Sequence, residues 1–224
     1  MSASNSGHSN SEHRVGKYAG KDNPNSRDDH PMRSENIFFS QRYGASWEEL
    51  PYWEGLVDFN GCGLVSLTMC IDIVTGRNFT PEDVYNMRKH YGIDQSRIAS
   101  RDGKCVCGGD VQFQFNPMNR KLFGIESCLL ERNLSAFKRA LAKDNTVIWA
   151  SSRNTDFYDK RGNSRWIYGG HVLCIWKFEE GDFWIKDPGL PKELGNNVLY
   201  SEKMMQEWIS GWEYQQFEVR KYSE

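Results

Sequence analysis

Residues 60–70 read Asn-Gly-Cys-Gly-Leu-Val-Ser-Leu-Thr-Met-Cys, and this stretch decides the fold because it opens a helix that is apolar nearly all round. The apolar run continues to Thr75 and Gly76 ends it, which predicts a buried central helix over 62–75. Cys62 stands at the start of that helix, where the positive end of the helix dipole favours a thiolate and so a nucleophile. The alternative is a small buried apolar side chain, which is the commoner role of a free cysteine.

Residues 167–189 predict a β-hairpin. Two runs rich in aromatic and β-branched residues flank a short acidic loop, as hairpin strands do. A three-residue loop over 179–181 would place Gly181 in the left-handed conformation that such loops need. That loop pairs Phe178 with Asp182.

This register brings two polar side chains together. Leu173 falls opposite Asp187, so His171 and Asp187 lie diagonally on one face, about 7–8 Å apart at the backbone, where their side chains can hydrogen-bond. We expect that face to press against the Cys62 helix, because it also carries a row of large apolar side chains: Leu173, Ile175, Phe183 and Ile185. A two-residue loop would invert the faces of one strand and destroy the arrangement.

Together these residues suggest a Cys-His-Asp triad. Cys62 would be the nucleophile, His171 the general base and acid, and Asp187 the group that orients the imidazole. Each also has an ordinary explanation, since a lone strand histidine is usually structural and Asp187 before Pro188-Gly189 is common turn chemistry. The occurrence of all three in this chain order favours the triad.

The segments around Cys62 and His171, with the closing Asp187-Pro188-Gly189, resemble the bacteriocin-processing (double-glycine leader) type of papain-like cysteine peptidase, above all its stand-alone relatives. The resemblance runs from about Ile37 to the C-terminus, with an unmatched middle. It implies a papain-like α+β fold, with the central buried helix packed on an antiparallel sheet.

The resemblance also implies an oxyanion hole. The family has a glutamine upstream of the cysteine, and Gln41 is the only glutamine before Cys62. Its amide and the backbone N–H of Cys62 would be the two donors. Family members commonly have Pro-Thr or Pro-Ala after the Cys-Gly pair, whereas this chain has Leu64-Val65, a difference that bears on substrate specificity.

Glycines and tryptophans near these positions are candidates for substrate binding. Gly61, Gly63 and Gly170 would let a substrate backbone lie close. Trp53 and Trp166 could wall a groove for an extended peptide or a glycan strand, or could be core and rim packing.

Composition narrows the class of protein. The 224 residues carry a formal net charge of −2, which gives no electrostatic case for nucleic acid or an anionic membrane. No run of about eighteen apolar residues is present, so we expect no membrane span. Residues 1–34 are polar and predict a disordered tail before a domain over 35–224. The tail lacks the apolar core of a signal peptide, so we expect a cytoplasmic protein or one exported without a recognisable signal. Nothing predicts an oligomeric state.

The six cysteines do not suggest a disulfide framework, because one catalytic thiol leaves an odd number. Cys70 and Cys174 are expected in the core. Cys105, Cys107 and Cys128 could bind a metal or form a regulatory bridge, but their spacing is unlike that of a zinc knuckle. We therefore expect no metal, no cofactor and a reducing compartment.

The remaining periodicities predict helices first and strands later, an α+β arrangement. We expect a helix from Pro81 to about His90, capped by Thr80, and then an irregular stretch over Ile93–Gly124. The other expected elements are a helix from Ser135 to near Lys143, a strand over Thr146–Ser151, a helix over Ser201–Ile209 and a strand over Trp212–Lys221.

The function that the sequence favours is a thiol hydrolase that cleaves a peptide or isopeptide bond through an acyl-enzyme, with a peptide or protein as substrate. A peptidoglycan amidase or a transamidase would use the same triad. A catalytically silent peptide-binding module on the same fold is the alternative from another class, although it would have no need to keep all four polar groups.

Overall fold

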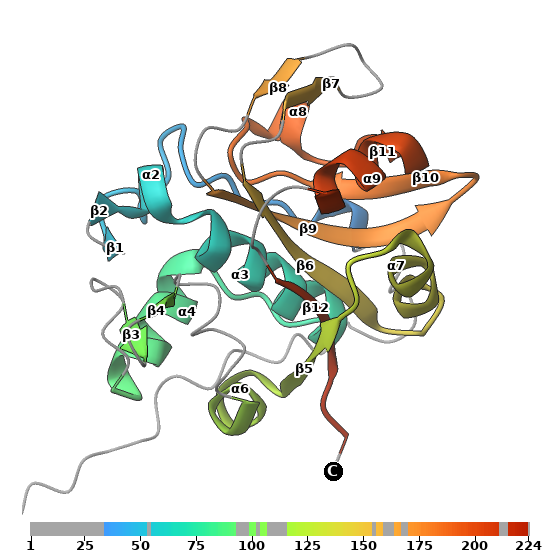
Figure 1. The fold of residues 1–224 in the computed structure, drawn as a ribbon. Helices are drawn as coiled ribbons and strands as arrows, with labels where there is room; N and C mark the ends of the chain where they lie inside the picture. Colours follow the sequence, from blue (N-terminus) through green and yellow to red (C-terminus); the bar gives the residue numbers. More distant parts are fainter. Residues whose placement is uncertain are drawn as a thin grey trace, which may run out of the picture.

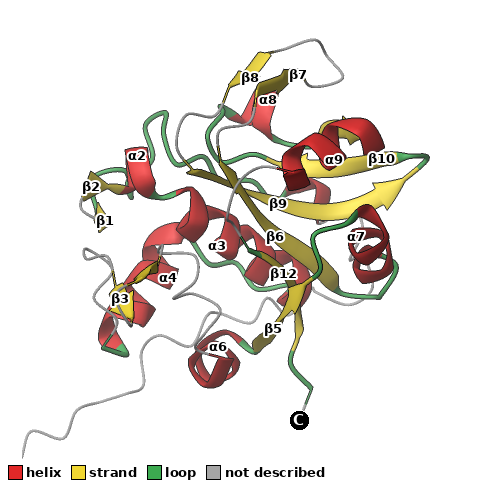
Figure 2. Ribbon diagram, in the orientation of Figure 1, coloured by secondary structure: helices red, strands yellow, loops and turns green. Residues whose placement is uncertain are grey.

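The computed structural model describes residues 34–52, 55–92, 99–101, 104–106, 116–153, 156–158, 164–166, 170–210 and 215–223. Within them, a six-stranded antiparallel sheet carries helices on both faces (Figure 1 and Figure 2). Across the sheet the strands are β11 (Val198–Ser201), β10 (Asp182–Lys186), β9 (Gly170–Glu179), β6 (Thr146–Arg153), β12 (Gln216–Lys221) and β5 (Ile125–Leu130).

The predicted central helix is confirmed as α3 (Cys62–Thr75). Every residue from Gly63 to Val74 is buried, and Gly76 ends the helix in the left-handed conformation at φ 69°. One face of the sheet packs on α3 through side chains from three central strands: Val147, Trp149, Val172, Cys174, Trp176, Phe217 and Val219. An apolar helix is stable here because other elements surround it.

The opposite face of the sheet is covered by α7 (Leu134–Leu141) and α9 (Glu202–Ser210), as Figure 1 shows. Their apolar sides bury Leu173, Ile175, Phe183 and Ile185. The prediction that these four residues face the Cys62 helix is therefore wrong. Both faces of the sheet are buried, so apolar side chains alone could not tell one face from the other.

The hairpin of β9 and β10 forms with a different loop from the one predicted. Glu179 pairs with Asp182, so the loop has two residues, and both Glu180 (φ 51°) and Gly181 (φ 84°) are left-handed. Two-residue hairpins favour this conformation because its twist matches that of the strands.

A β-bulge restores the predicted register further along the hairpin. Lys177 pairs with Trp184 but Ile175 pairs with Ile185, so Trp176 is the extra residue. Beyond the bulge Ile175 pairs with Ile185 and Cys174 with Lys186, which is the register of the prediction that set Leu173 opposite Asp187. The inversion expected of a two-residue loop is undone before the strands reach His171.

Several other predictions are confirmed within about two residues, except that the last strand, predicted from Trp212, begins at Gln216. The helix α4 (Pro81–His90) begins with a capping box between Thr80 and Asp83. Strand β6, helix α9 and strand β12 correspond to the elements expected there, and α7 has its cap at Asn133, whose side chain accepts from the Ala136 N–H, rather than at Ser135.

The stretch over 93–124 was predicted as irregular, and this is wrong for its last part, which forms α6 (Asn116–Phe123), and for two short paired strands over 99–101 and 104–106. Strand β5 and strand β11 were not predicted. The remaining described elements are short: β1 (Pro51–Tyr52), β2 (Gly55–Leu56), α2 (Val57–Asn60), β3 (Ala99–Arg101), β4 (Lys104–Val106), β7 (Asp156–Tyr158), β8 (Ser164–Trp166) and α8 (Lys192–Gly195). None of the helices in the described part of the chain has both the length and the apolar character that a membrane span requires.

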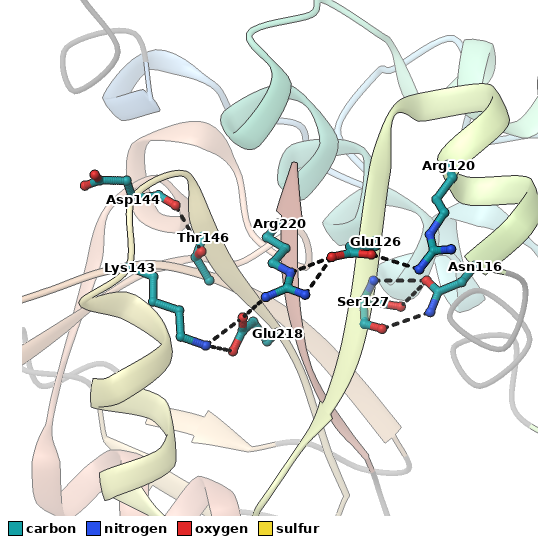
Figure 3. A network of polar contacts seen from close by, with 9 residues as sticks. All are labelled: Asn116, Arg120, Glu126, Ser127, Lys143, Asp144, Thr146, Glu218 and Arg220. Atoms are coloured by element: carbon teal, nitrogen blue, oxygen red, sulfur yellow. Dashed lines mark hydrogen bonds and ion pairs between the residues drawn. The ribbon is translucent and has the colours of Figure 1, made fainter. Parts of the chain in front are cut away.

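Side chains of alternating charge form a chain of ion pairs at the β5 edge of the sheet (Figure 3). Glu126 on β5 receives Arg120 from α6 at 2.9 Å and Arg220 from β12 at 2.6 Å. Arg220 lies 3.8 Å from Glu218, which Lys143 contacts at 2.7 Å. Burial alone would raise the pKa of Glu126, but hydrogen bonds from the two arginines outweigh it and hold that pKa below its usual value.

Candidate active site

His171 and Asp187 form a hydrogen-bonded pair, as the register predicted. His171 Nε2 lies 2.8 Å from Asp187 Oδ1, and the Asp187 side chain is 0% exposed while that of His171 is 13% exposed. The same Oδ1 accepts the backbone N–H of Gly189 at 2.9 Å. A buried carboxylate held in this way fixes the plane and position of the imidazole.

The pair also selects the histidine tautomer. A carboxylate accepts hydrogen bonds, so Nε2 carries the proton that it donates to Asp187. Nδ1 is then the ring nitrogen that can accept a proton from a nucleophile. A histidine that acts as a general base needs this arrangement, in which one ring nitrogen donates to a carboxylate and the other can accept a proton.

Gly189 lies directly against this pair. A Cβ added at Gly189 would be 3.0 Å from His171 Cε1 and 3.3 Å from Asp187 Oδ1. Those contacts are tighter than ordinary van der Waals packing, so a side chain would push on the ring or the carboxylate. Sequence reasoning assigned Gly189 to turn chemistry, because nothing in the local sequence reveals which side chain packs over the turn.

Cys62 is the first residue of α3, as the sequence predicted, and it is half-buried. The first turns of the helix are attached to the sheet by two hydrogen bonds. Ser66 Oγ donates to the carbonyl of Val172 on β9 at 3.2 Å, and Trp149 Nε1 donates to the carbonyl of Gly63 at 3.0 Å. Ser66 is one turn after Cys62 on the same side of the helix, and Val172 follows His171.

His171 belongs to the face of β9 that is opposite to α3. Its ring lies edge-on to that of Trp208 on α9, with centroids 6.3 Å apart. Val172, the next residue, points to α3. His171 is only the second residue of the strand, so its side chain stands at the end of the sheet rather than within it.

Gln41 is buried and is hydrogen-bonded both to the turn after Asp187 and to the helix before Cys62. Its backbone N–H donates to the carbonyl of Pro188 at 2.8 Å, next to Asp187. Its side-chain Nε2 donates to the carbonyls of Asp58 at 2.9 Å and Phe59 at 3.4 Å, in the helix just before Cys62. The amide is therefore fixed at the N-terminal side of α3.

Of the predicted substrate-binding residues, the three glycines can be placed relative to these groups. Gly61 and Gly63 are buried beside Cys62, and Gly170 is exposed at the start of β9. A Cβ at Gly61 would lie 2.5 Å from the Val57 carbonyl, so close packing alone accounts for this glycine. Trp53 lies outside the described residues, and the side chain of Trp166 in β8 is likewise not described. Substrate binding by these five residues stays a prediction.

The other cysteines fall into two groups. Cys70 and Cys174 are buried, as predicted, and their thiols contact each other between α3 and β9. Burial, and then the contact with Cys174, raise the pKa of the Cys70 thiol well above its ordinary value. Cys128 is exposed on β5, the side chain of Cys105 is not described, and Cys107 lies outside the described residues. Groups of three or more side chains suited to a metal are absent from the described part of the chain.

Lys186 is a polar residue near the site that sequence reasoning missed. It precedes Asp187, is 0% exposed, and its ammonium donates to Asn196 Oδ1 at 2.7 Å. A lysine in a strand normally indicates an exposed position, so the sequence carried no signal for its burial.

No protein-family model and no curated protein matches the chain. Similar solved structures include a protein from Bacillus anthracis described as a C39-like peptidase, which is 15% identical with a TM-score of 0.50 over 85% of this chain and 97% of that one. Another is the peptidase domain of Streptococcus ComA, a bifunctional ABC transporter involved in quorum sensing; it is 14% identical with a TM-score of 0.39 over 74% of this chain and 93% of that one. At such identities the first likeness shows the fold alone. The chain therefore has the α+β fold of a C39-like peptidase, a central buried helix on an antiparallel sheet, as the resemblance implied.

Proposed function

We propose that the protein is a cysteine peptidase of the papain-like kind, which cleaves a peptide or isopeptide bond through an acyl-enzyme. The observation that carries the proposal is the buried His171–Asp187 hydrogen bond of 2.8 Å, made next to the strand residue on which the Cys62 helix is anchored. A histidine whose tautomer is fixed by a buried carboxylate is what activation of a thiol requires.

The reaction would proceed in two halves. The Cys62 thiolate attacks the carbonyl carbon of the scissile bond, and imidazolium Nδ1 of His171 gives its proton to the leaving amine as the C–N bond breaks. A thioester remains on Cys62. Nδ1 then takes a proton from water, the hydroxide oxygen attacks the thioester, and the C–S bond breaks to release the acid and restore the Cys62 thiolate beside the imidazolium. Asp187 holds the ring throughout.

Gln41 would stabilise the oxyanion with the backbone N–H of Cys62. Its Nε2 has one short hydrogen bond, to Asp58, and one weak contact of 3.4 Å, to Phe59. A developing oxyanion would replace the weaker contact without moving the amide. A donor of this kind is worth roughly 3–4 kcal/mol of transition-state stabilisation.

The meeting of Cys62 and His171 would take place at the end of the sheet. His171 and α3 belong to opposite faces of β9, so the two side chains would approach around the beginning of the strand rather than across its face. The position of His171, one residue from the start of β9, favours this approach.

A digest of a peptide library by the full chain tests the proposal. Wild type should cleave a subset of peptides, Cys62→Ala should cleave none, and Cys128→Ala, which changes an exposed thiol on β5, should cleave like wild type. Ligation of added amines instead of hydrolysis would indicate a transamidase. Binding of peptides without turnover by wild type would indicate a binding module and contradict the proposal.

Substitution of Asp187 separates the acceptor oxygen from the charge. Asp187→Asn keeps an oxygen that can accept from His171 Nε2 and the Gly189 N–H, so we expect it to retain more kcat than Asp187→Ala. The alanine variant should lose about 10²–10⁴-fold, because the imidazole is no longer oriented. Steady-state kinetics on one cleaved peptide measures this, and equal activities of the two variants would contradict the role of Asp187.

A further inference from the structure

A buried lysine lies beside the catalytic carboxylate and is not used by the proposed chemistry. Lys186 ends β10 with its side chain 0% exposed, and its Nζ lies 5.1 Å from the centroid of the Trp176 ring. Within the described residues its three hydrogen-bond acceptors are neutral: Asn196 Oδ1 at 2.7 Å, Asn197 Oδ1 at 3.1 Å and the carbonyl of Glu35 at 3.3 Å. An ammonium has three N–H groups, so each has one oxygen.

The same carbonyl of Glu35 is the centre of a polar cluster. Asn196 Nδ2 donates to it at 3.0 Å and Asn197 Nδ2 at 3.2 Å, in addition to Lys186. A backbone carbonyl that accepts from three side chains is held much more firmly than an ordinary turn requires. Asn197 adopts φ 59°, a conformation that asparagine tolerates better than most residues.

Residues 35–41, here called the N-terminal strap, run from this cluster to the active site. At the far end of the strap, Gln41 N–H and Ser40 Oγ both bond to the carbonyl of Pro188, at 2.8 and 3.2 Å. Near its middle, Phe38 passes so close to Gly195 that a Cβ there would be 2.8 Å from Phe38 Cζ. The carbonyl of Gly195 in turn accepts the Asp187 N–H at 2.9 Å.

We infer that Lys186 is a positioning residue, which with Asn196 and Asn197 anchors the N-terminal strap and so sets the place of the Gln41 amide. The inference rests on the proposed thiol hydrolase and adds a residue to it. Burial lowers the pKa of Lys186 to about 8, so the fold accepts the desolvation of a charged group at this spot. An anchor that only filled space would be served better by an apolar side chain.

A double-mutant cycle on the full chain tests whether Lys186 acts through Gln41. We expect Lys186→Met to lower kcat for a cleaved peptide by about 10–100-fold with little change in KM, and Gln41→Ala to lower it by about 10²–10³-fold. In the Gln41→Ala background, Lys186→Met should then change kcat less than threefold, because the group it positions is gone. Full multiplication of the two losses, or a wild-type kcat for Lys186→Met, would overturn the inference.

Asn197→Gly provides a milder variant if Lys186→Met fails to fold. It keeps the left-handed backbone but removes the two bonds of Asn197 to Lys186 and Glu35, so kcat should fall about five- to tenfold. Asn145→Gly is the matched control, since Asn145 is left-handed at φ 50° in the exposed turn before β6, and its kcat should equal that of wild type. Equal kcat for Asn197→Gly and Asn145→Gly would overturn the inference.

The rate of Cys62 alkylation by iodoacetamide distinguishes this failure from failure of the proposed function. Alkylation requires no oxyanion donor. Iodoacetamide should therefore alkylate Cys62 in Lys186→Met and in Asn197→Gly within twofold of the wild-type rate. A wild type that neither hydrolyses peptides nor alkylates quickly at Cys62 would overturn both proposals. Fast alkylation and hydrolysis that are unaffected by either variant would overturn only the role of Lys186.

Discussion

At the scale of single residues, two glycines on one hairpin and its following turn have opposite expected roles. Gly189 has a Cβ direction that points at His171 and Asp187, whereas Gly181 has nothing within 4 Å but a φ of 84°. The first is required for close approach and the second for backbone conformation.

Gly189→Ala should therefore lower kcat about tenfold, because the imidazole must shift by a few tenths of an ångström, while the free energy of unfolding changes little. Gly181→Ala should do the reverse, with kcat unchanged and a loss of about 1–2 kcal/mol in the free energy of unfolding. Peptide kinetics and urea denaturation of both variants measure the two effects. Equal losses of stability, or unchanged kcat in Gly189→Ala, would contradict this division.

The predicted His171–Asp187 hydrogen bond forms because a two-residue loop and a bulge together restore the register that the predicted three-residue loop would have given. The sequence was sufficient for the position of Cys62 at the start of a buried helix, since that depends on an apolar run between glycines. It did not predict the burial of Lys186 or the close contact of Gly189 with His171. The burial of Lys186 depends on Glu35, which is far away in the sequence. The contact of Gly189 depends on how the turn after β10 lies against His171 on β9.

At the scale of elements, the β9–β10 hairpin keeps its predicted register through two features that the sequence did not reveal. The two-residue loop shifts the pairing by one position, and the bulge at Trp176 shifts it back. The acidic loop sequence does not distinguish two residues from three. Trp176, the extra residue, belongs to the same core cluster as Val172 and Cys174.

The left-handed conformation of Glu180 gives an element-scale prediction. Glu180→Asn should stabilise the hairpin by about 0.5–1 kcal/mol, since asparagine tolerates φ 51° better than glutamate and Asn-Gly favours this turn. In a chain of this length the melting temperature should rise by about 1–3 °C. Differential scanning calorimetry measures the change, and Glu179→Asn, in the strand, is the control that should not raise it. A lower melting temperature for Glu180→Asn would contradict the turn assignment.

At the scale of the whole molecule, the sheet is buried on both faces and its β5 edge is held by charge. The α+β class and the central helix could be predicted because long apolar periodicity identifies them. The order of strands could not, since β5 and β11 are the two edges of the sheet and gain their stability from pairing with β12 and β10.

The ion-pair chain in Figure 3 predicts an acid-dependent loss of stability. The folded pKa of Glu126 lies below its usual 4.5, so its contribution is present above that pH and is lost as the pH falls through the folded pKa. Glu126→Gln should be less stable than wild type by about 1 kcal/mol above pH ~5, and the difference should shrink towards pH ~3. Urea denaturation at several pH values measures it, with Glu131→Gln, at an exposed pair, as the control. A difference that is independent of pH would contradict the assignment.

The pH dependence of Cys62 alkylation by iodoacetamide, in wild type and in His171→Ala, tests the central claim most directly. If Cys62 and His171 act as a pair, wild-type Cys62 reacts quickly and at a nearly constant rate from pH 6 to pH 8. His171→Ala would then react at least tenfold more slowly at pH 6, with a rate that rises with pH like that of an ordinary thiol of pKa about 8.5. Peptide mapping would find Cys70, whose pKa burial raises, unmodified in both proteins. A Cys62 that reacts with the same slow, rising profile in both proteins, no faster than the exposed Cys128, would contradict the account.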